Sequence, residues 1–130
     1  MSTTGTRTAA GMVAEAKSRI ENLAPGEVAR EVAGGALLVD IREADERAQN
    51  GIIPGAVHAP RGMLEFYADP TSTYHRPEFK PDSRVILHCA SGGRSALACD
   101  MLAGLGYRRA AHLDGGLKAW KEQGLQVGEA

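Results

Sequence analysis

The stretch RVILHCASGGRSA, residues 84–96, decides the fold of this chain. Its first part, residues 84–88, is a short apolar run typical of a buried strand, and residues 94–105 form a strongly apolar helical segment. Between them lie Cys89 and a run of small residues. Ligands of open α/β sheets bind where strands end and helices begin. We therefore expect a ligand site in the loop that starts at Cys89.

The composition of this loop suits a cysteine nucleophile. Gly92 and Gly93 can adopt backbone conformations closed to other residues, and the two residues before them are small enough to let the loop curl. Inward N–H groups and the following helix N-terminus would form an anion cradle. Because the thiolate is the reactive form, these donors and the nearby Arg94 favour a reactive Cys89. The alternative is a structural cysteine at a strand end, but small residues followed by arginine favour the functional interpretation.

Outward from this stretch, strands and helices alternate along the chain. Further apolar runs predict strands at residues 36–39, 56–58 and 109–113, and helical spacing or breaker residues predict helices at residues 11–23, 25–34, 43–50 and 116–123. Residues 61–81 lose the pattern and predict a short helix followed by a long loop. This alternation predicts an α/β fold with a mostly parallel central sheet and helices on both faces.

Composition limits the classes of protein that remain. The length of 130 residues predicts a single domain, placed over residues 11–130. Residues 1–10 hold nothing that could bury apolar surface and are predicted to form a flexible tail. A net charge of -1 argues against nucleic-acid or anionic-membrane partners. The longest aliphatic run, residues 36–39, is far below the roughly 20 residues of a membrane span. Two cysteines make no disulfide framework, no metal-ligand spacing is present, and the start of the chain lacks a secretory pattern, so we expect a cytoplasmic protein without metal.

Four motifs in order resemble the rhodanese family over residues 20–125. Residues 89–95, CASGGRS, resemble the active-site loop Cys-x-x-Gly-x-Arg of single-domain rhodaneses. Residues 37–43, LLVDIRE, resemble the Asp-x-Arg strand end, and residues 51–56, GIIPGA, resemble the Gly-His-Ile-Pro-Gly-Ala segment. Residues 113–120, LDGGLKAW, resemble the closing Gly-Gly-x-x-x-Trp motif.

The resemblance implies the three-layer rhodanese-like fold and a sulfurtransferase that needs no cofactor. It implies that Cys89 takes a sulfane sulfur from an anionic donor such as thiosulfate, holds it as a persulfide, and passes it to a thiophilic acceptor. The acceptor would be a thiol or a cyanide-like nucleophile, and a protein persulfide is a further candidate partner. The implied substrate-binding residues are Ala90, Ser91, Gly92, Gly93, Arg94 and Ser95. Asp40 and Arg42 would support the pocket without taking part in the chemistry.

Two departures from the family pattern and two rival functions accompany this hypothesis. Ile52 stands where the family usually has histidine, and residues 61–81 are longer than the minimal fold requires. Four residues of this insert are candidates for a lid, although an ordinary solvated loop is the preferred interpretation: Arg61, Tyr74, His75 and Arg76. One rival is a cysteine phosphatase or arsenate reductase, which has five residues between its cysteine and arginine where this chain has four. The other is a non-catalytic sulfur carrier or protein-docking module.

The remaining chemistry-bearing residues have simpler structural interpretations. Cys99 lies among apolar helix residues and is expected to pack in the core. His88 precedes Cys89 on the strand, where alternation turns its side chain away from that of the cysteine. His58 and His112 lie on strands and are expected to be structural, and Trp120 is expected to anchor the last helix in the core.

Overall fold

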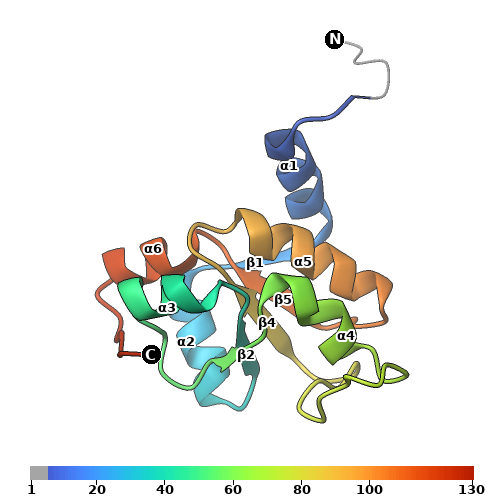
Figure 1. Ribbon diagram of the computed structural model, residues 1–130. Helices are drawn as coiled ribbons and strands as arrows, with labels where there is room; N and C mark the ends of the chain where they lie inside the picture. Colours follow the sequence, from blue (N-terminus) through green and yellow to red (C-terminus); the bar gives the residue numbers. More distant parts are fainter. Residues whose placement is uncertain (1–5) are drawn as a thin grey trace.

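A single parallel sheet organises the molecule, and the computed structural model describes residues 6–130 of it (Figure 1). Its strands run in the order β1-β5-β4-β2-β3, and every ladder is parallel. The five strands are β1 (Glu21–Leu23), β2 (Leu37–Asp40), β3 (Val57–His58), β4 (Val85–His88) and β5 (Ala110–Leu113). The parallel α/β sheet predicted from the sequence is therefore confirmed.

Helices cover both faces of the sheet, which gives the three predicted layers (Figure 1). They are α1 (Ala9–Arg19), α2 (Pro25–Ala33), α3 (Ala44–Asn50), the 3-10 turn η1 (Arg61–Met63), α4 (Leu64–Ala68), α5 (Gly93–Gly104) and α6 (Gly116–Glu122). Alternate residues of β4 point to opposite faces. Val85 and Leu87 pack with residues of α4 and α5, whereas Ile86 packs with residues of α2 and α6.

The edge strand β1 was not predicted from the sequence. The helix predicted over residues 11–23 ends at Arg19, and Glu21–Leu23 pairs in parallel with residues 111–113 of β5. Three residues carry too little periodicity to show a strand, and it is the pairing with β5 that fixes their conformation. At the other end, α1 begins at Ala9, where the Thr8 side chain accepts the Gly11 N–H at 2.9 Å. The predicted tail thus includes two helical residues, and residues 1–5 lie outside the described residues.

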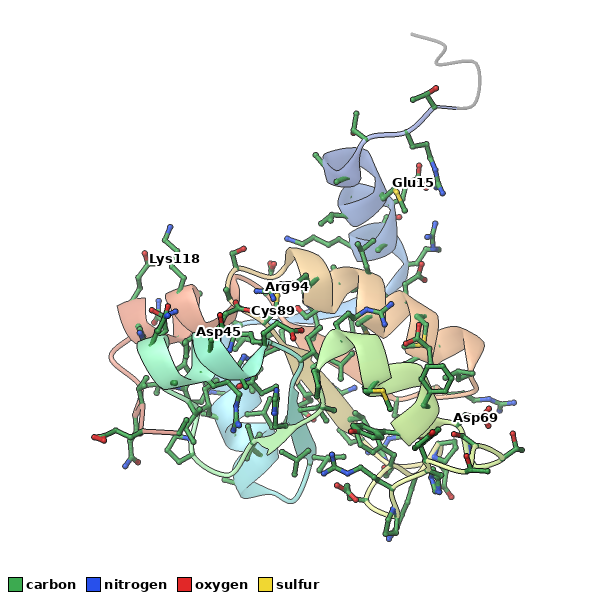
Figure 2. All side chains as sticks on the ribbon, in the orientation of Figure 1. Glu15, Asp45, Asp69, Cys89, Arg94 and Lys118 are labelled. Carbon is green, nitrogen blue, oxygen red and sulfur yellow. The ribbon has the colours of Figure 1, made fainter. Side chains whose placement is uncertain are left out.

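The insert at residues 61–81 is folded against the sheet, and α4 at its start packs in the same core cluster as Cys89. After α4 it proceeds through turns, with Phe79 fully buried in the core. The Arg76 guanidinium donates to the His58 carbonyl at 2.9 Å. In Figure 2, Asp69 marks this segment at the opposite end of the molecule from Lys118, with Cys89 between them. The insert therefore completes the core on the side of α4 and α5.

Candidate active site

The loop between β4 and α5 gathers backbone N–H groups around the Cys89 sulfur. The Gly92 N–H donates to Sγ at 3.2 Å and the Ser95 N–H donates at 3.4 Å. Gly92 has a φ of 105°, in the left-handed region that favours glycine, and this turn brings its N–H back to the sulfur. Two converging amide dipoles favour negative charge on Sγ, as on an adduct bound to it.

The start of α6 braces this loop from behind. The N–H groups of Leu117 and Lys118 donate to the carbonyls of Cys89 and Ala90, both at 3.0 Å. These bonds satisfy helix-terminal donors that would otherwise lack a partner. The approach requires glycine at position 116, because a Cβ there would lie 2.6 Å from the Ala90 carbonyl carbon and oxygen. The sequence motif of two glycines before α6 thus serves the cysteine loop directly.

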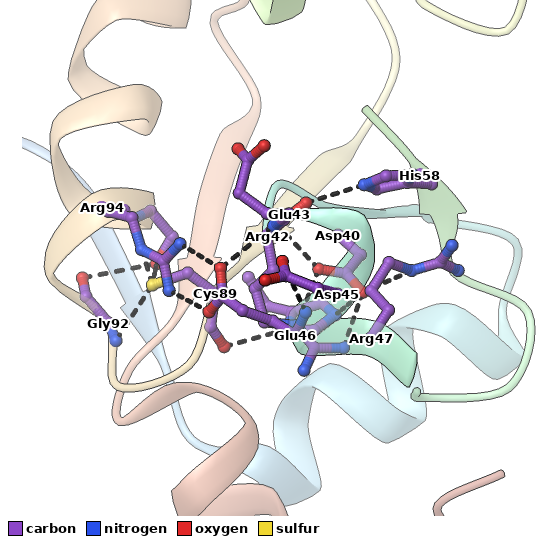
Figure 3. A network of polar contacts seen from close by, with 12 residues as sticks. Asp40, Arg42, Glu43, Asp45, Glu46, Arg47, His58, Cys89, Gly92 and Arg94 are labelled. Carbon is purple, nitrogen blue, oxygen red and sulfur yellow. Dashed lines mark hydrogen bonds and ion pairs between the residues drawn. The ribbon is translucent and has the colours of Figure 1, made fainter. Parts of the chain in front are cut away.

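Arg94, the last residue of the Cys-x4-Arg pattern, faces the site but holds a carboxylate. Its two terminal nitrogens lie 2.8 Å from the two carboxylate oxygens of Glu46 on α3 (Figure 3). The hydrogen bonds from Arg94 lower the pKa of Glu46 to about 2, and those with Glu46 raise the pKa of Arg94. A two-pronged contact of this kind is the one that guanidinium makes to carboxylates and other oxyanions. The predicted anion contact of Arg94 therefore has a competitor, Glu46, that the sequence did not reveal.

The Asp-x-Arg motif lies beneath the loop as a buried ion pair. Arg42 donates from Nε and from a terminal nitrogen to Asp40 at 3.0 and 2.8 Å, and both side chains are buried. Burial is the largest single effect and opposes the charge on Asp40, but the hydrogen bonds and charge of Arg42, together with His88, outweigh it and lower the pKa of Asp40 to about 2. Arg47 adds a contact to Asp40 at 3.1 Å, and Arg42 also donates to the Gly51 carbonyl at 2.8 Å (Figure 3). The pair holds the ends of β2 and α3 together, a supporting position.

An open pocket of about 230 Å³ adjoins the loop on the side of α6. Its lining residues are Arg42, Asn50, Ala90, Leu117, Lys118 and Lys121. Because Arg42 is already paired with Asp40, the cationic groups that a ligand meets here are Lys121 and Lys118, the latter with only a 4.0 Å contact to Glu122. Ala90 joins this pocket to the cysteine loop, so an anionic molecule approaching Cys89 from this side meets positive charge.

A polar chain behind the cysteine, buried at Ser95 and His112 and ending at the exposed Asn22, was not foreseen. Ser95 Oγ lies 3.6 Å from Cys89 Sγ and 2.8 Å from Nδ1 of His112, whose Nε2 lies 2.7 Å from Oδ1 of Asn22. Asn22 and His112 are paired residues of β1 and β5. The sequence marked His112 only as a strand histidine, and the missed strand β1 hid its partner.

The other cysteine and histidines occupy structural positions. Cys99 is buried in α5, and burial raises the pKa of its thiol to about 12. Burial lowers the pKa of His88, whose Nε2 lies 3.8 Å from an Asp40 oxygen, away from Cys89 Sγ. His58 Nε2 lies 2.7 Å from the Arg42 carbonyl oxygen, and Trp120 is buried with its ring N–H donating to the Gln126 carbonyl. Within residues 6–130 no three metal-binding side chains cluster, and no helix is long and apolar enough to cross a membrane.

Fold and site together define an α/β protein with a cysteine in an amide-lined loop, and comparison with known proteins gives its family. The chain matches the rhodanese-like domain over residues 24–123 and belongs to that family. A sulfurtransferase of Allochromatium vinosum is 38% identical over 91 residues, which cover 70% of this chain and 77% of that protein. These findings support sulfur transfer as the general activity.

Solved structures agree on the fold. A protein of Rhodopseudomonas palustris, described as of unknown function and a possible tyrosine phosphatase, superposes with a TM-score of 0.88 at 38% identity, covering 98% of each chain. The polysulfide-sulfur transferase homodimer of Wolinella succinogenes superposes with a TM-score of 0.73 at 25% identity, covering 91% of this chain and 85% of that chain.

Proposed function

We propose that this protein transfers sulfane sulfur from a small anionic donor such as thiosulfate to a thiophilic acceptor, with Cys89 as the carrier. The observation that supports this most is the convergence of the Gly92 and Ser95 N–H groups on the Cys89 sulfur. Such donors stabilise a thiolate before the reaction and a charged sulfur adduct after it. The substrate-binding residues of the proposal remain Ala90, Ser91, Gly92, Gly93, Arg94 and Ser95.

The proposed reaction has two balanced steps. The Cys89 thiolate attacks the outer sulfur of thiosulfate, the S–S bond of the donor breaks, and its electron pair leaves with sulfite. This forms a persulfide anion on Cys89 in reach of the loop donors. A nucleophile such as cyanide or a thiolate then attacks the terminal sulfur, and the electron pair of the persulfide bond returns to Sγ. Each step exchanges one bond for another, so the cycle needs no external oxidant or reductant.

The charge around the loop favours an anionic donor. Lys118 and Lys121 line the pocket beside Ala90, and Arg94 faces Cys89 from the opposite end of the loop. A dianionic donor displaces the Glu46 carboxylate from Arg94, or binds at the lysines while Glu46 stays in place.

The phosphatase alternative has a specific observation behind it, the description of the Rhodopseudomonas palustris protein. A phosphatase loop must wrap three equatorial oxygens of a phosphoryl group, and the enzymes that do so have five residues between cysteine and arginine. Here four residues separate Cys89 from Arg94. The shorter loop makes a smaller cradle, which suits a single outer sulfur better than a tetrahedral oxyanion.

Steady-state assays of three variants test the proposal. Wild type and Cys99→Ser should form thiocyanate from thiosulfate and cyanide at similar rates, and Cys89→Ser should form none. None of the three should hydrolyse an aryl phosphate. Phosphate release that depends on Cys89, without thiocyanate formation, would replace the proposal with the phosphatase. If neither thiocyanate formation nor phosphate release is seen, and a protein persulfide also fails as donor, the protein-docking module becomes the preferred interpretation.

The setting of the reaction follows from the free thiols. Both Cys89 and Cys99 are unpaired, and a persulfide carrier needs a reduced cysteine. We therefore infer a reducing, cytoplasmic compartment and partners of two kinds, a small anionic donor and a thiol or cyanide-like acceptor. The balanced charge of the chain supports neither a nucleic-acid nor a membrane partner.

A further inference from the structure

We propose that Asn22 and His112 act as positioning residues that hold the Ser95 hydroxyl proton away from the Cys89 sulfur. Ser95 then accepts a hydrogen bond from the thiol and gives none to the thiolate. The inference deepens the proposed function, on which its catalytic meaning rests. It stands on a continuous chain of buried or half-buried contacts from β1 through β5 to α5.

The direction of the chain is set by the amide of Asn22. Its Nδ2 donates to the carbonyls of Lys17 and Ile20 at 3.0 and 3.2 Å, in the bend between α1 and β1. Only the nitrogen of a side-chain amide can donate to carbonyls. The oxygen of Asn22 must therefore point the other way, toward His112 Nε2 at 2.7 Å.

The orientation of Asn22 fixes the tautomer of His112. Because Asn22 Oδ1 can only accept, Nε2 of His112 carries the proton. Burial lowers the pKa of His112 to about 4, so the ring is neutral near pH 7 and its Nδ1 has a free lone pair. Two charged groups act on the ring, and they oppose each other: Asp114 raises its pKa and Lys17 lowers it, while Lys17 Nζ lies 3.0 Å from the Asp114 carboxylate.

The bare Nδ1 then takes the only proton of the Ser95 hydroxyl. Ser95 Oγ lies 2.8 Å from Nδ1 and 3.3 Å from the Gly92 carbonyl oxygen. If the hydroxyl donated to Gly92 instead, two lone pairs would face each other at 2.8 Å, which is repulsive. The hydroxyl therefore donates to His112 and presents a lone pair to Cys89 Sγ, 3.6 Å away.

The consequence is that the Ser95 hydroxyl adds no hydrogen bond to the Cys89 thiolate. The thiolate is held by the N–H groups of Gly92 and Ser95, with Arg94 and its partner Glu46 as the charged groups that face it, and not by the adjacent hydroxyl. Thiolates lose intrinsic nucleophilicity as they are stabilised, and the best attacking thiol ionises near the working pH. The Asn22–His112 pair thus keeps Cys89 a strong attacking group for a sulfur donor.

Alkylation of Cys89 by iodoacetamide, followed against pH, tests the arrangement without any sulfur donor. His112→Ala frees the hydroxyl to turn toward the thiolate, and Asn22→Leu lets His112 move its proton to Nδ1 with the same result. Each should lower the pH midpoint of alkylation by about one unit, a tenfold change in the thiolate-to-thiol ratio. Adding Ser95→Ala to either variant should cancel the shift, because the hydroxyl is its source.

A measurement on the unaltered protein covers the case in which a variant does not fold. A long-range proton–nitrogen spectrum of His112 at pH 7 should show hydrogen on Nε2 and a bare Nδ1. Hydrogen on Nδ1 would overturn the proposal, as would an unchanged midpoint in folded His112→Ala and Asn22→Leu or a shift that survives Ser95→Ala. Because neither readout uses a sulfur donor, failure of the proposed transfer activity leaves this test independent.

Discussion

The two cysteines of the chain are equally buried but lie in different backbone surroundings. Cys89 and Cys99 each expose 1% of their surface, and both belong to the same hydrophobic cluster. Cys89 ends a strand and receives N–H groups from a glycine-rich loop, whereas Cys99 lies inside α5 with its own backbone engaged in the helix. Burial without donors raises the pKa of Cys99 to about 12.

The pair separates the effect of burial from the effect of the backbone around a thiol. What differs is the backbone: a left-handed turn at Gly92 directs amide dipoles at one sulfur, and a regular helix directs none at the other. The side chains of both cysteines are the same, so any difference in reactivity measures the contribution of the surrounding fold.

The largest expected effect is in the alkylation rates of the two thiols. In native protein at pH 7, iodoacetamide should label Cys89 at least about a hundredfold faster than Cys99, because the pKa of Cys99 leaves almost no thiolate. Peptide mapping of briefly treated protein measures the ratio, and Cys89→Ser should remain nearly unlabelled until it is unfolded. Comparable labelling of both sites would remove the basis of the comparison.

The hydrogen bonds from the start of α6 to the Cys89 loop give a second test of the comparison between the two cysteines. Gly116→Ala should destabilise the protein by about 3 kcal/mol, since the new Cβ adds a clash with the Ala90 carbonyl to the strain of a positive φ. Gly124→Ala is the matched control: it lies beyond the other end of α6, also at positive φ, with nothing within 4 Å of the new Cβ. It should cost about 1 kcal/mol. Equal losses in urea unfolding would show that α6 does not brace the loop.

Removing the positive charge of Arg94, which faces Cys89, tests how much that charge contributes to sulfur transfer. Arg94→Ala should weaken transfer from thiosulfate by about 1.5–3 kcal/mol, roughly tenfold to a hundredfold in kcat/KM, because a charge-assisted contact to the donor is lost. Glu46→Gln is the control, since it frees Arg94 and should leave kcat/KM equal or higher. Unchanged kinetics in folded Arg94→Ala would assign the arginine to structure alone.

The smallest predicted effect is a loss of folding stability at acidic pH. The pKa of His112 is about 4 in the folded protein and about 6.5 when unfolded, so its contribution to stability is complete above pH 6.5 and is lost as the pH falls toward 4. At pH 5.5 the loss from this group should be about 1 kcal/mol. Urea unfolding at pH 7 and pH 5.5 measures it, and His112→Asn should reduce the drop. An identical drop in that variant would locate the acid sensitivity elsewhere.

The sequence was sufficient for the parallel sheet and for the loop around Cys89. Both depend on local signals: short apolar runs for the strands, and small residues before Arg94 for the turn. Helices on both faces followed from continuous apolar character in the strands, which is how a sheet covered on two sides is encoded.

The sequence was insufficient where residues distant along the chain meet. The three residues of β1 become a strand only by pairing with β5, about ninety positions later. The contact of Asn22 with His112 was not predicted because it depends on the same strand pairing. The contact of Glu46 on α3 with Arg94 was not predicted because no sequence spacing relates the two residues. Such contacts depend on side-chain placement in the folded sheet, which one sequence does not specify.

The most direct test of the central claim, that Cys89 carries the sulfur, is an intact-mass measurement after brief exposure to thiosulfate. Wild type and Cys99→Ser should each gain the mass of one sulfur atom, and cyanide or a reducing thiol should remove it. Cys89→Ser should gain nothing, because a serine hydroxyl is too weakly acidic to attack a sulfur centre. A sulfur adduct on the Cys89→Ser variant would contradict the account. So would the absence of an adduct on the Cys99→Ser variant.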